Sequence, residues 1–104
     1  DQDPPKSLEE LQRAVSNPKR GYDIHHIVTK KAAKDDGFSD EIIDGHDNLA
    51  LIPRYRHWKI NSWYETPNEE FNGLRPRDWL RGKSWEARRR VGLRALVDFG
   101  VLQP

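Results

Sequence analysis

Histidine is the residue type in this sequence best suited to chemistry at neutral pH, and two of its four histidines, His25 and His26, are adjacent. Neutral imidazole binds divalent metal ions, and a free imidazole can accept a proton from water. Both residues lie in a run typical of a β-strand, where successive side chains point to opposite faces. We therefore expect a division of labour between one metal ligand and one general base. In most adjacent histidine pairs, however, one histidine is a hydrogen-bonded core residue and the other is solvated, and neither has a chemical role.

A third histidine and two asparagines follow the pair in an ordered way. His57 lies in a predicted helix, and Asn61 follows it at i+4 on the same helical face, so both side chains can point at one ion. Asn48 ends a long polar connection, where its amide can bond to the backbone beside the histidine pair. Each residue alone would pass as an ordinary surface or turn residue. His46 has no comparable relation to the others, and we expect it to be solvated.

Three short runs carry this combination: DIHHIV at 23–28, NLALI at 48–52 and HWKIN at 57–61. Their order, on strand, loop, strand and helix, resembles the HNH (His-Me finger, ββα-metal) nuclease family. Within that family they look most like the HH-type nuclease domains at the C-termini of bacterial polymorphic toxins. The resemblance covers residues 21–64, less than half of the chain, and residues 73–102 also resemble the extension of such toxins.

The resemblance implies a role for each matching position. His26 would be the general base that activates water, and Asn48 the structural asparagine that orients the His26 loop. Three residues would be metal ligands: His25, His57 and Asn61. The expected reaction is hydrolysis of phosphodiester bonds to 5′-phosphate and 3′-hydroxyl ends, in DNA by preference, with RNA not excluded.

An amide oxygen in the third ligand position leaves the identity of the metal open. We expect one divalent ion, Mg²⁺ or Mn²⁺ during turnover, with Zn²⁺ or Ni²⁺ also possible. The chain has no cysteine, which excludes disulfides, thiolate zinc sites and cysteine catalysis.

The charge is distributed unevenly along the chain although the formal net charge is only +1. Residues 1–53 carry 7 basic and 11 acidic side chains, whereas residues 54–104 carry 11 basic and 6 acidic ones. A basic half can present a phosphate-binding face, although charges that merely solvate helices would give the same count. The predicted nucleic-acid contacts are Arg54, Arg56, Lys59, Arg75 and Arg77.

Local signals predict the elements that must position these residues. The expected order is a helix capped by Ser7 and Glu10, a strand at 22–28, a long polar connection at 29–47 with a helical turn at 30–34, a strand at 49–52, and helices at 54–64, 74–81 and 85–100. Core candidates are Tyr22, Ile24, Ile27, Leu49, Leu51, Ile60 and the four tryptophans, Trp58, Trp63, Trp79 and Trp85.

The expected fold class is therefore α+β, a mainly helical small domain around a ββα-metal core with a two-stranded antiparallel hairpin. We expect a single HNH-like nuclease domain over residues 1–104. It would consist of an N-terminal helical lead-in (1–20), the ββα-metal core (21–64) and a helical C-terminal extension (65–104).

The absence of methionine and the family resemblance together predict the biological setting. A chain without methionine is expected to be excised from a longer polypeptide, here a larger secreted carrier. The toxin resemblance implies action in the cytoplasm of a target cell and a cognate immunity protein, which we expect to be acidic. Apolar runs of no more than four or five residues exclude a membrane span.

The sequence leaves two alternatives to the toxin open. The chain could be a non-toxin HNH nuclease with a restriction or phage role. It could also be a non-catalytic, metal-stabilised nucleic-acid-binding module, for which a closed tetrahedral metal site would be expected.

Overall fold

The first helix begins at the predicted capping box in the computed structural model, which describes residues 3–104. Helix α1 (Leu8–Arg13) continues as a 3₁₀ turn, η1 (Ala14–Ser16). The Ser7 hydroxyl accepts a bond from the Glu10 amide, and the Glu10 carboxylate accepts one from the Ser7 amide, both at 3.2 Å. Two of the exposed backbone donors at the helix start are thereby satisfied.

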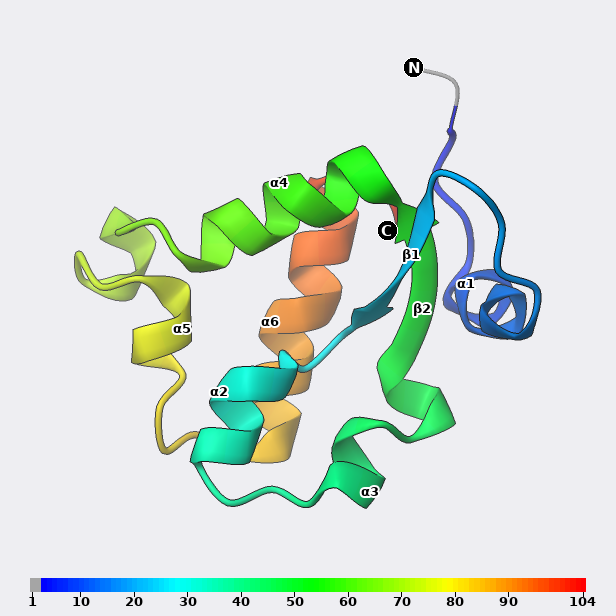
Figure 1. The fold of residues 1–104 in the computed structure, drawn as a ribbon. Helices are drawn as coiled ribbons and strands as arrows, with labels where there is room; N and C mark the ends of the chain where they lie inside the picture. Colours follow the sequence, from blue (N-terminus) through cyan, green and yellow to red (C-terminus); the bar gives the residue numbers. More distant parts are fainter. Residues whose placement is uncertain (1–2) are drawn as a thin grey trace.

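Two antiparallel strands form the hairpin at the centre of the molecule (Figure 1). Strand β1 (Tyr22–His26) pairs with β2 (Leu49–Pro53), so that His26 lies opposite Leu49. The α+β class and the two-stranded antiparallel hairpin are thus confirmed. The predicted first strand was two residues too long, because the backbone after His26 turns away and bonds to Asn48 instead.

The connection between the strands is more ordered than the sequence predicts. Helix α2 (Lys30–Asp35) confirms the expected helical turn, but helix α3 (Asp40–Ile43) and the 3₁₀ turn η2 (His46–Asn48) were not predicted. The Ser39 hydroxyl caps α3 by accepting a bond from the Ile42 amide at 3.3 Å. The connection also has its own small core of Val28, Ala33 and Ile43, with Phe38 and Trp85 packed against it.

Helices make up the rest of the chain. They are α4 (Arg54–Tyr64), the 3₁₀ turn η3 (Glu69–Phe71), α5 (Pro76–Trp79) and α6 (Trp85–Asp98). As predicted, Pro76 lies in the first turn of α5, the Ser84 hydroxyl caps α6, and Gly100 ends the last helix with φ +76°. Within the described part of the chain, none of the helices combines the length and apolar character needed to span a membrane.

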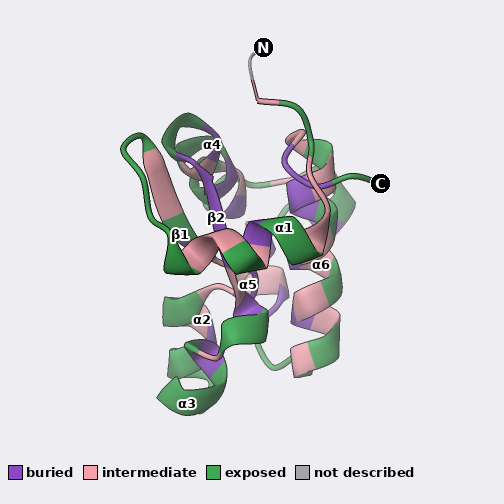
Figure 2. Cartoon of the chain, turned by 90° about the vertical axis from the view of Figure 1, so that its right-hand side faces the viewer, coloured by how far each residue is buried: buried purple, intermediate pink, exposed green. Residues whose placement is uncertain are grey.

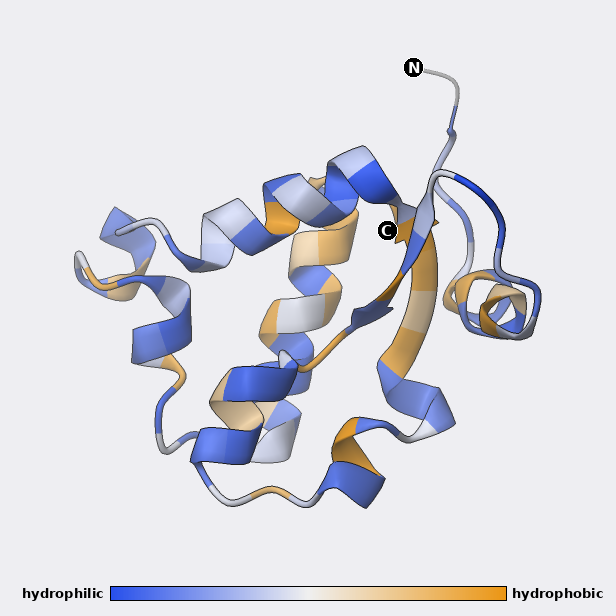
Figure 3. Cartoon of the chain, viewed as in Figure 1, coloured by the Kyte–Doolittle hydropathy of each residue, from blue (hydrophilic) through white to orange (hydrophobic). Residues whose placement is uncertain are grey.

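The main core lies where β2, α4 and α6 meet. Strand β2 is the most continuously buried and apolar segment, as Figures 2 and 3 show. The prediction of a core position is wrong for two residues. Ile24 exposes 43% of its surface to solvent, and Trp58 exposes 65%. Ile24 lies on the opposite face of β1 from His25, and Trp58 directly follows the inward-facing His57, so both point outward.

Helix α6 approaches the end of β1 at Gly92. A Cβ atom at this position would lie 2.1 Å from the carbonyl oxygen of Ile27, the residue after His26. The helix backbone therefore rests directly on the backbone that positions the histidine pair, and only glycine permits this contact.

Replacing Gly92 by alanine should push α6 away from this backbone. We expect Gly92→Ala to lower the free energy of unfolding by about 3 kcal/mol, as overpacking of a rigid backbone contact does. Urea denaturation would measure the change. Arg90→Ala, on the exposed side of the same helix, is the control and should change stability by less than about 0.5 kcal/mol. Equal effects of the two substitutions would contradict the contact.

Candidate metal centre

The pleat of β1 sends the two adjacent histidines to opposite faces. His25 is almost completely buried, with 2% of its surface exposed, and lies beside His57 of α4. His26 points toward the connection between the strands, where its Nε2 lies 2.8 Å from the Asp44 carboxylate. The two side chains therefore lie on opposite faces of the strand, as strand alternation predicts.

The start of α4 brings His57 to His25. The Arg54 amide donates a bond of 2.8 Å to the Gly21 carbonyl, which ties the first turn of the helix to the beginning of β1. One turn into the helix, the imidazole of His57 meets that of His25 edge to face, with ring centroids 5.2 Å apart.

Asp23 orients the imidazole of His57. Its Oδ2 lies 3.0 Å from His57 Nδ1, and its Oδ1 accepts a bond from Arg54 at 3.1 Å. The bond from His57, assisted by Arg54, lowers the pKa of Asp23, so this carboxylate stays ionised and acts only as an acceptor. Because an ionised carboxylate only accepts, His57 Nδ1 is the donor in this bond. A carboxylate that holds one ring nitrogen in this way is typical of metal-binding histidines, whose other ring nitrogen binds the metal.

His25 carries a buried nitrogen without a partner. Among the buried side-chain atoms of the described residues, its Nε2 is the one that makes no hydrogen bond. Burial lowers the pKa of His25 to about 3, with further contributions from His57 and His26, so the ring is neutral at pH 7. An unsatisfied buried polar atom is costly, and a cation facing it would remove that cost. The donor type, a neutral and unpartnered imidazole nitrogen beside a second imidazole, therefore suits a divalent metal ion.

The remaining proposed ligand lies on the same helix. Asn61 is exposed one turn after His57 and lines a cleft together with residues 29–32 and Arg77. Within residues 3–104, no three histidine, cysteine, aspartate or glutamate side chains come together as a metal-binding group. The structure thus brings together the two imidazoles, whereas the cleft that Asn61 lines includes neither His25 nor His57.

His26 is held by a carboxylate on the opposite side of the strand. Asp44 bonds both to His26 Nε2 and to the Lys30 ammonium group, the latter at 3.1 Å. Both bonds lower the pKa of Asp44, and the bond from His26 contributes most. An ionised carboxylate only accepts, so Nε2 of His26 is the donor in this bond, and Nδ1 is the ring nitrogen that Asp44 does not hold.

Asn48 fixes the backbone that follows the histidines. Its side chain is completely buried. The amide oxygen accepts a bond from the Val28 amide at 2.8 Å, and the amide nitrogen donates to the carbonyls of Val28 and Ile43 at 3.1 and 2.9 Å. This contact joins the chain leaving β1 to the chain entering β2.

The predicted phosphate contacts are placed in different ways. Lys59 is exposed, Arg54 pairs with Asp23, and Arg75 and Arg77 both pair with a glutamate at the end of α4. Arg56 is buried inside the fold, where it donates a bond of 2.8 Å to the Phe99 carbonyl. This structural use leaves Arg56 out of the proposed phosphate contacts. His46 is exposed, as the sequence predicts.

Two carboxylates of the site were missed by sequence reasoning. Asp23 could have been found, because it lies two residues before His25 on the same face of the strand. Asp44 could not, because it reaches His26 only through the unpredicted helix α3.

Comparisons of this chain with protein-family models, with curated proteins and with solved structures found no match. Its function is therefore inferred from the arrangement of its own residues.

Loss of the Asn48 side chain should destabilise the whole region. Asn48→Ala leaves three buried backbone groups without partners, so we expect the free energy of unfolding to fall by about 3 kcal/mol. Thermal and urea denaturation would measure it. Asn61→Ala removes the same amide from an exposed site and should leave stability within about 0.5 kcal/mol of the unaltered chain. If Asn48→Ala is equally benign, the proposed importance of the contact is wrong.

Proposed function

We propose that this chain is a metal-dependent endonuclease that hydrolyses nucleic-acid phosphodiester bonds, with DNA as the favoured substrate. The observation that carries the proposal is the buried, unpartnered Nε2 of His25 beside His57. A strand–strand–helix unit that presents two ligand-ready imidazoles and a separately held third histidine supports a ββα-metal core. No base-reading element accompanies these residues, and we therefore expect weak sequence preference.

The proposed ligands of one divalent ion are His25, His57 and Asn61. When bound, the ion supplies charge stabilisation at the scissile phosphate and at the leaving 3′-oxygen. We expect Mg²⁺ or Mn²⁺ to support turnover. The two nitrogen donors also suit Zn²⁺ or Ni²⁺.

His26 is the proposed general base. Its Nδ1 takes the proton of the attacking water, while Asp44 keeps the ring in the required tautomer and stabilises the imidazolium that forms. Lys30 in turn holds Asp44 in place. Asn48 supports this residue indirectly by fixing the backbone beyond β1.

We further propose that the nuclease acts as an antibacterial toxin domain. This role is supported by the likeness of residues 21–64 to HH-type toxin nucleases. The domain would reach the cytoplasm of a target cell as part of a larger secreted protein. The producing cell would protect itself with an acidic immunity protein that covers the basic surface or the metal site.

Removal of the His26 imidazole tests the mechanism. We expect His26→Ala to reduce plasmid nicking in Mg²⁺ or Mn²⁺ by about 10²- to 10⁴-fold, because the proton acceptor is lost. Calorimetry and circular dichroism should show metal binding and folding close to those of the unaltered chain. His46→Ala removes an exposed imidazole and should keep full activity. Full activity of His26→Ala, or undiminished activity of the unaltered chain in EDTA, would contradict the mechanism.

Expression in a bacterial cytoplasm tests the toxin role. We expect the unaltered chain to arrest growth and degrade cellular DNA, and His26→Ala to be tolerated at the same expression level. Co-expression of an acidic protein encoded beside the natural gene should restore growth. A chain that cleaves DNA in vitro but leaves growth unchanged would favour the non-toxin nuclease.

A further inference from the structure

A cleft with basic walls begins at Asn61. It has a volume of about 260 Å³ and lies between α2 and the ends of α4 and α5. Its cationic lining residues are Lys30, Lys31 and Arg77, and Glu65 is the one acidic residue among the described residues that line it. Lys30 pairs with Asp44 and Lys31 with Asp35, but both pairs are exposed and screened by water. The cleft therefore leads from the third proposed metal ligand along cationic side chains that a polyanion can reach.

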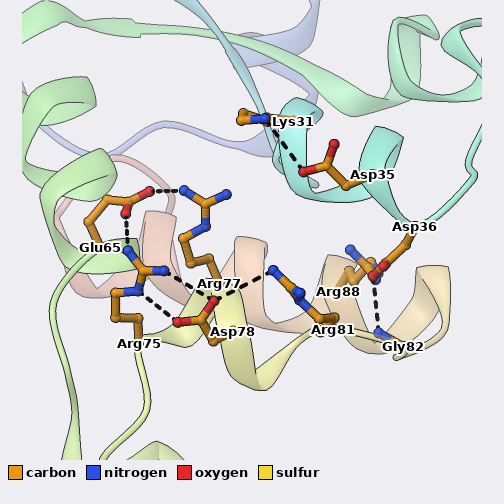
Figure 4. Close-up of polar contacts among 10 residues, drawn as sticks. All are labelled: Lys31, Asp35, Asp36, Glu65, Arg75, Arg77, Asp78, Arg81, Gly82 and Arg88. Carbon is orange, nitrogen blue, oxygen red and sulfur yellow. Dashed lines mark hydrogen bonds and ion pairs between the residues drawn. The ribbon is translucent and has the colours of Figure 1, made fainter.

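Glu65 joins two arginines at one wall of this cleft (Figure 4). One of its carboxylate oxygens accepts a bond from Arg77 at 2.7 Å, and the other accepts one from Arg75 at 3.0 Å. Arg75 has a second carboxylate partner, Asp78, at 2.7 Å. In the described part of the chain, Arg77 pairs with Glu65 alone, so displacing Glu65 would free the charge of Arg77 and leave Arg75 paired.

The position of Glu65 is unfavourable for the helix that it follows. It caps the C-terminal end of α4, an 11-residue helix. That end carries partial negative charge, which disfavours a carboxylate. Helix stability therefore does not explain an acidic residue at position 65. Its ion pairs with Arg75 and Arg77 do explain it.

A phosphate group can accept the same N–H donors that the Glu65 carboxylate now occupies. We propose that Arg77 binds a backbone phosphate of DNA lying along this cleft, and that Glu65 occupies the phosphate position in the free protein and is displaced on binding. This inference rests on the proposed nuclease function. Glu65 is half exposed, so its ion pairs are screened by water and are readily exchanged for a phosphate.

Affinity for a short fluorescein-labelled DNA duplex tests the inference. Fluorescence anisotropy in EDTA and at low ionic strength measures binding without cleavage. We expect Glu65→Gln to lower the Kd about fivefold and Arg77→Gln to raise it about fivefold. In the Arg77→Gln background, Glu65→Gln should have no further effect, because no guanidinium remains to be released.

Glu69→Gln is the matched control. It removes the same charge from an exposed residue of η3 whose side chain forms no ion pair with any residue between 3 and 104. We expect it to change the Kd less than twofold. A shift equal to that of Glu65→Gln, or a Glu65→Gln effect that persists without Arg77, would show that Glu65 acts only through net charge and would overturn the inference.

Cleavage of the same duplex in Mn²⁺ separates the two proposals. If the unaltered chain cleaves the duplex but the Glu65 and Arg77 variants bind it no differently, the inference fails and the nuclease stands. If these variants shift the Kd as expected and no metal supports cleavage, the phosphate cleft stands and the nuclease fails. An unaltered chain that does not bind the duplex overturns the inference, whatever its activity.

Discussion

The buried side chain of Asn48 is the contact on which the geometry of the site depends. It forms hydrogen bonds with backbone groups of Val28 and Ile43. Val28 lies just after β1, and Ile43 lies in α3, the last α-helix before β2. A side-chain amide combines one acceptor oxygen with two N–H donors, so it can accept from the Val28 amide and donate to two carbonyls at once. Because these groups are shielded from water, losing the contact would cost far more than an exposed hydrogen bond. Asn48 thereby fixes the end of β1 relative to helix α3 of the connection.

The hairpin gives similar residues different environments. His25 is enclosed with His57, and burial keeps its ring neutral, whereas His26 remains partly accessible beside Asp44. In each environment a carboxylate fixes which ring nitrogen carries the proton, Asp23 for His57 and Asp44 for His26. Under the proposed function, these different surroundings assign the separate roles of metal ligand and general base to identical side chains.

The fold also rearranges the charges that the sequence separates into halves. Lys30 and Lys31 come from the acidic half, yet they line the same cleft as Arg77 from the basic half. Conversely, Arg56 is buried and Arg54 forms an ion pair with Asp23, so part of the basic charge is used within the fold. The electrostatic surface therefore depends on which ion pairs form within the fold, and a count of charges along the chain does not describe it.

Local interactions made the starts of the first and last helices, the two strands and the opposite orientation of His25 and His26 predictable from the sequence. Capping by Ser7 and Ser84 and the pleat of a strand involve only residues within a few positions of one another. The tertiary structure alone decided the approach of His57 to His25, the pairing of Asp44 with His26, the burial of Arg56 and the bridge of Glu65 to two arginines. Each of these joins residues from different elements, and such contacts form only when the elements pack together.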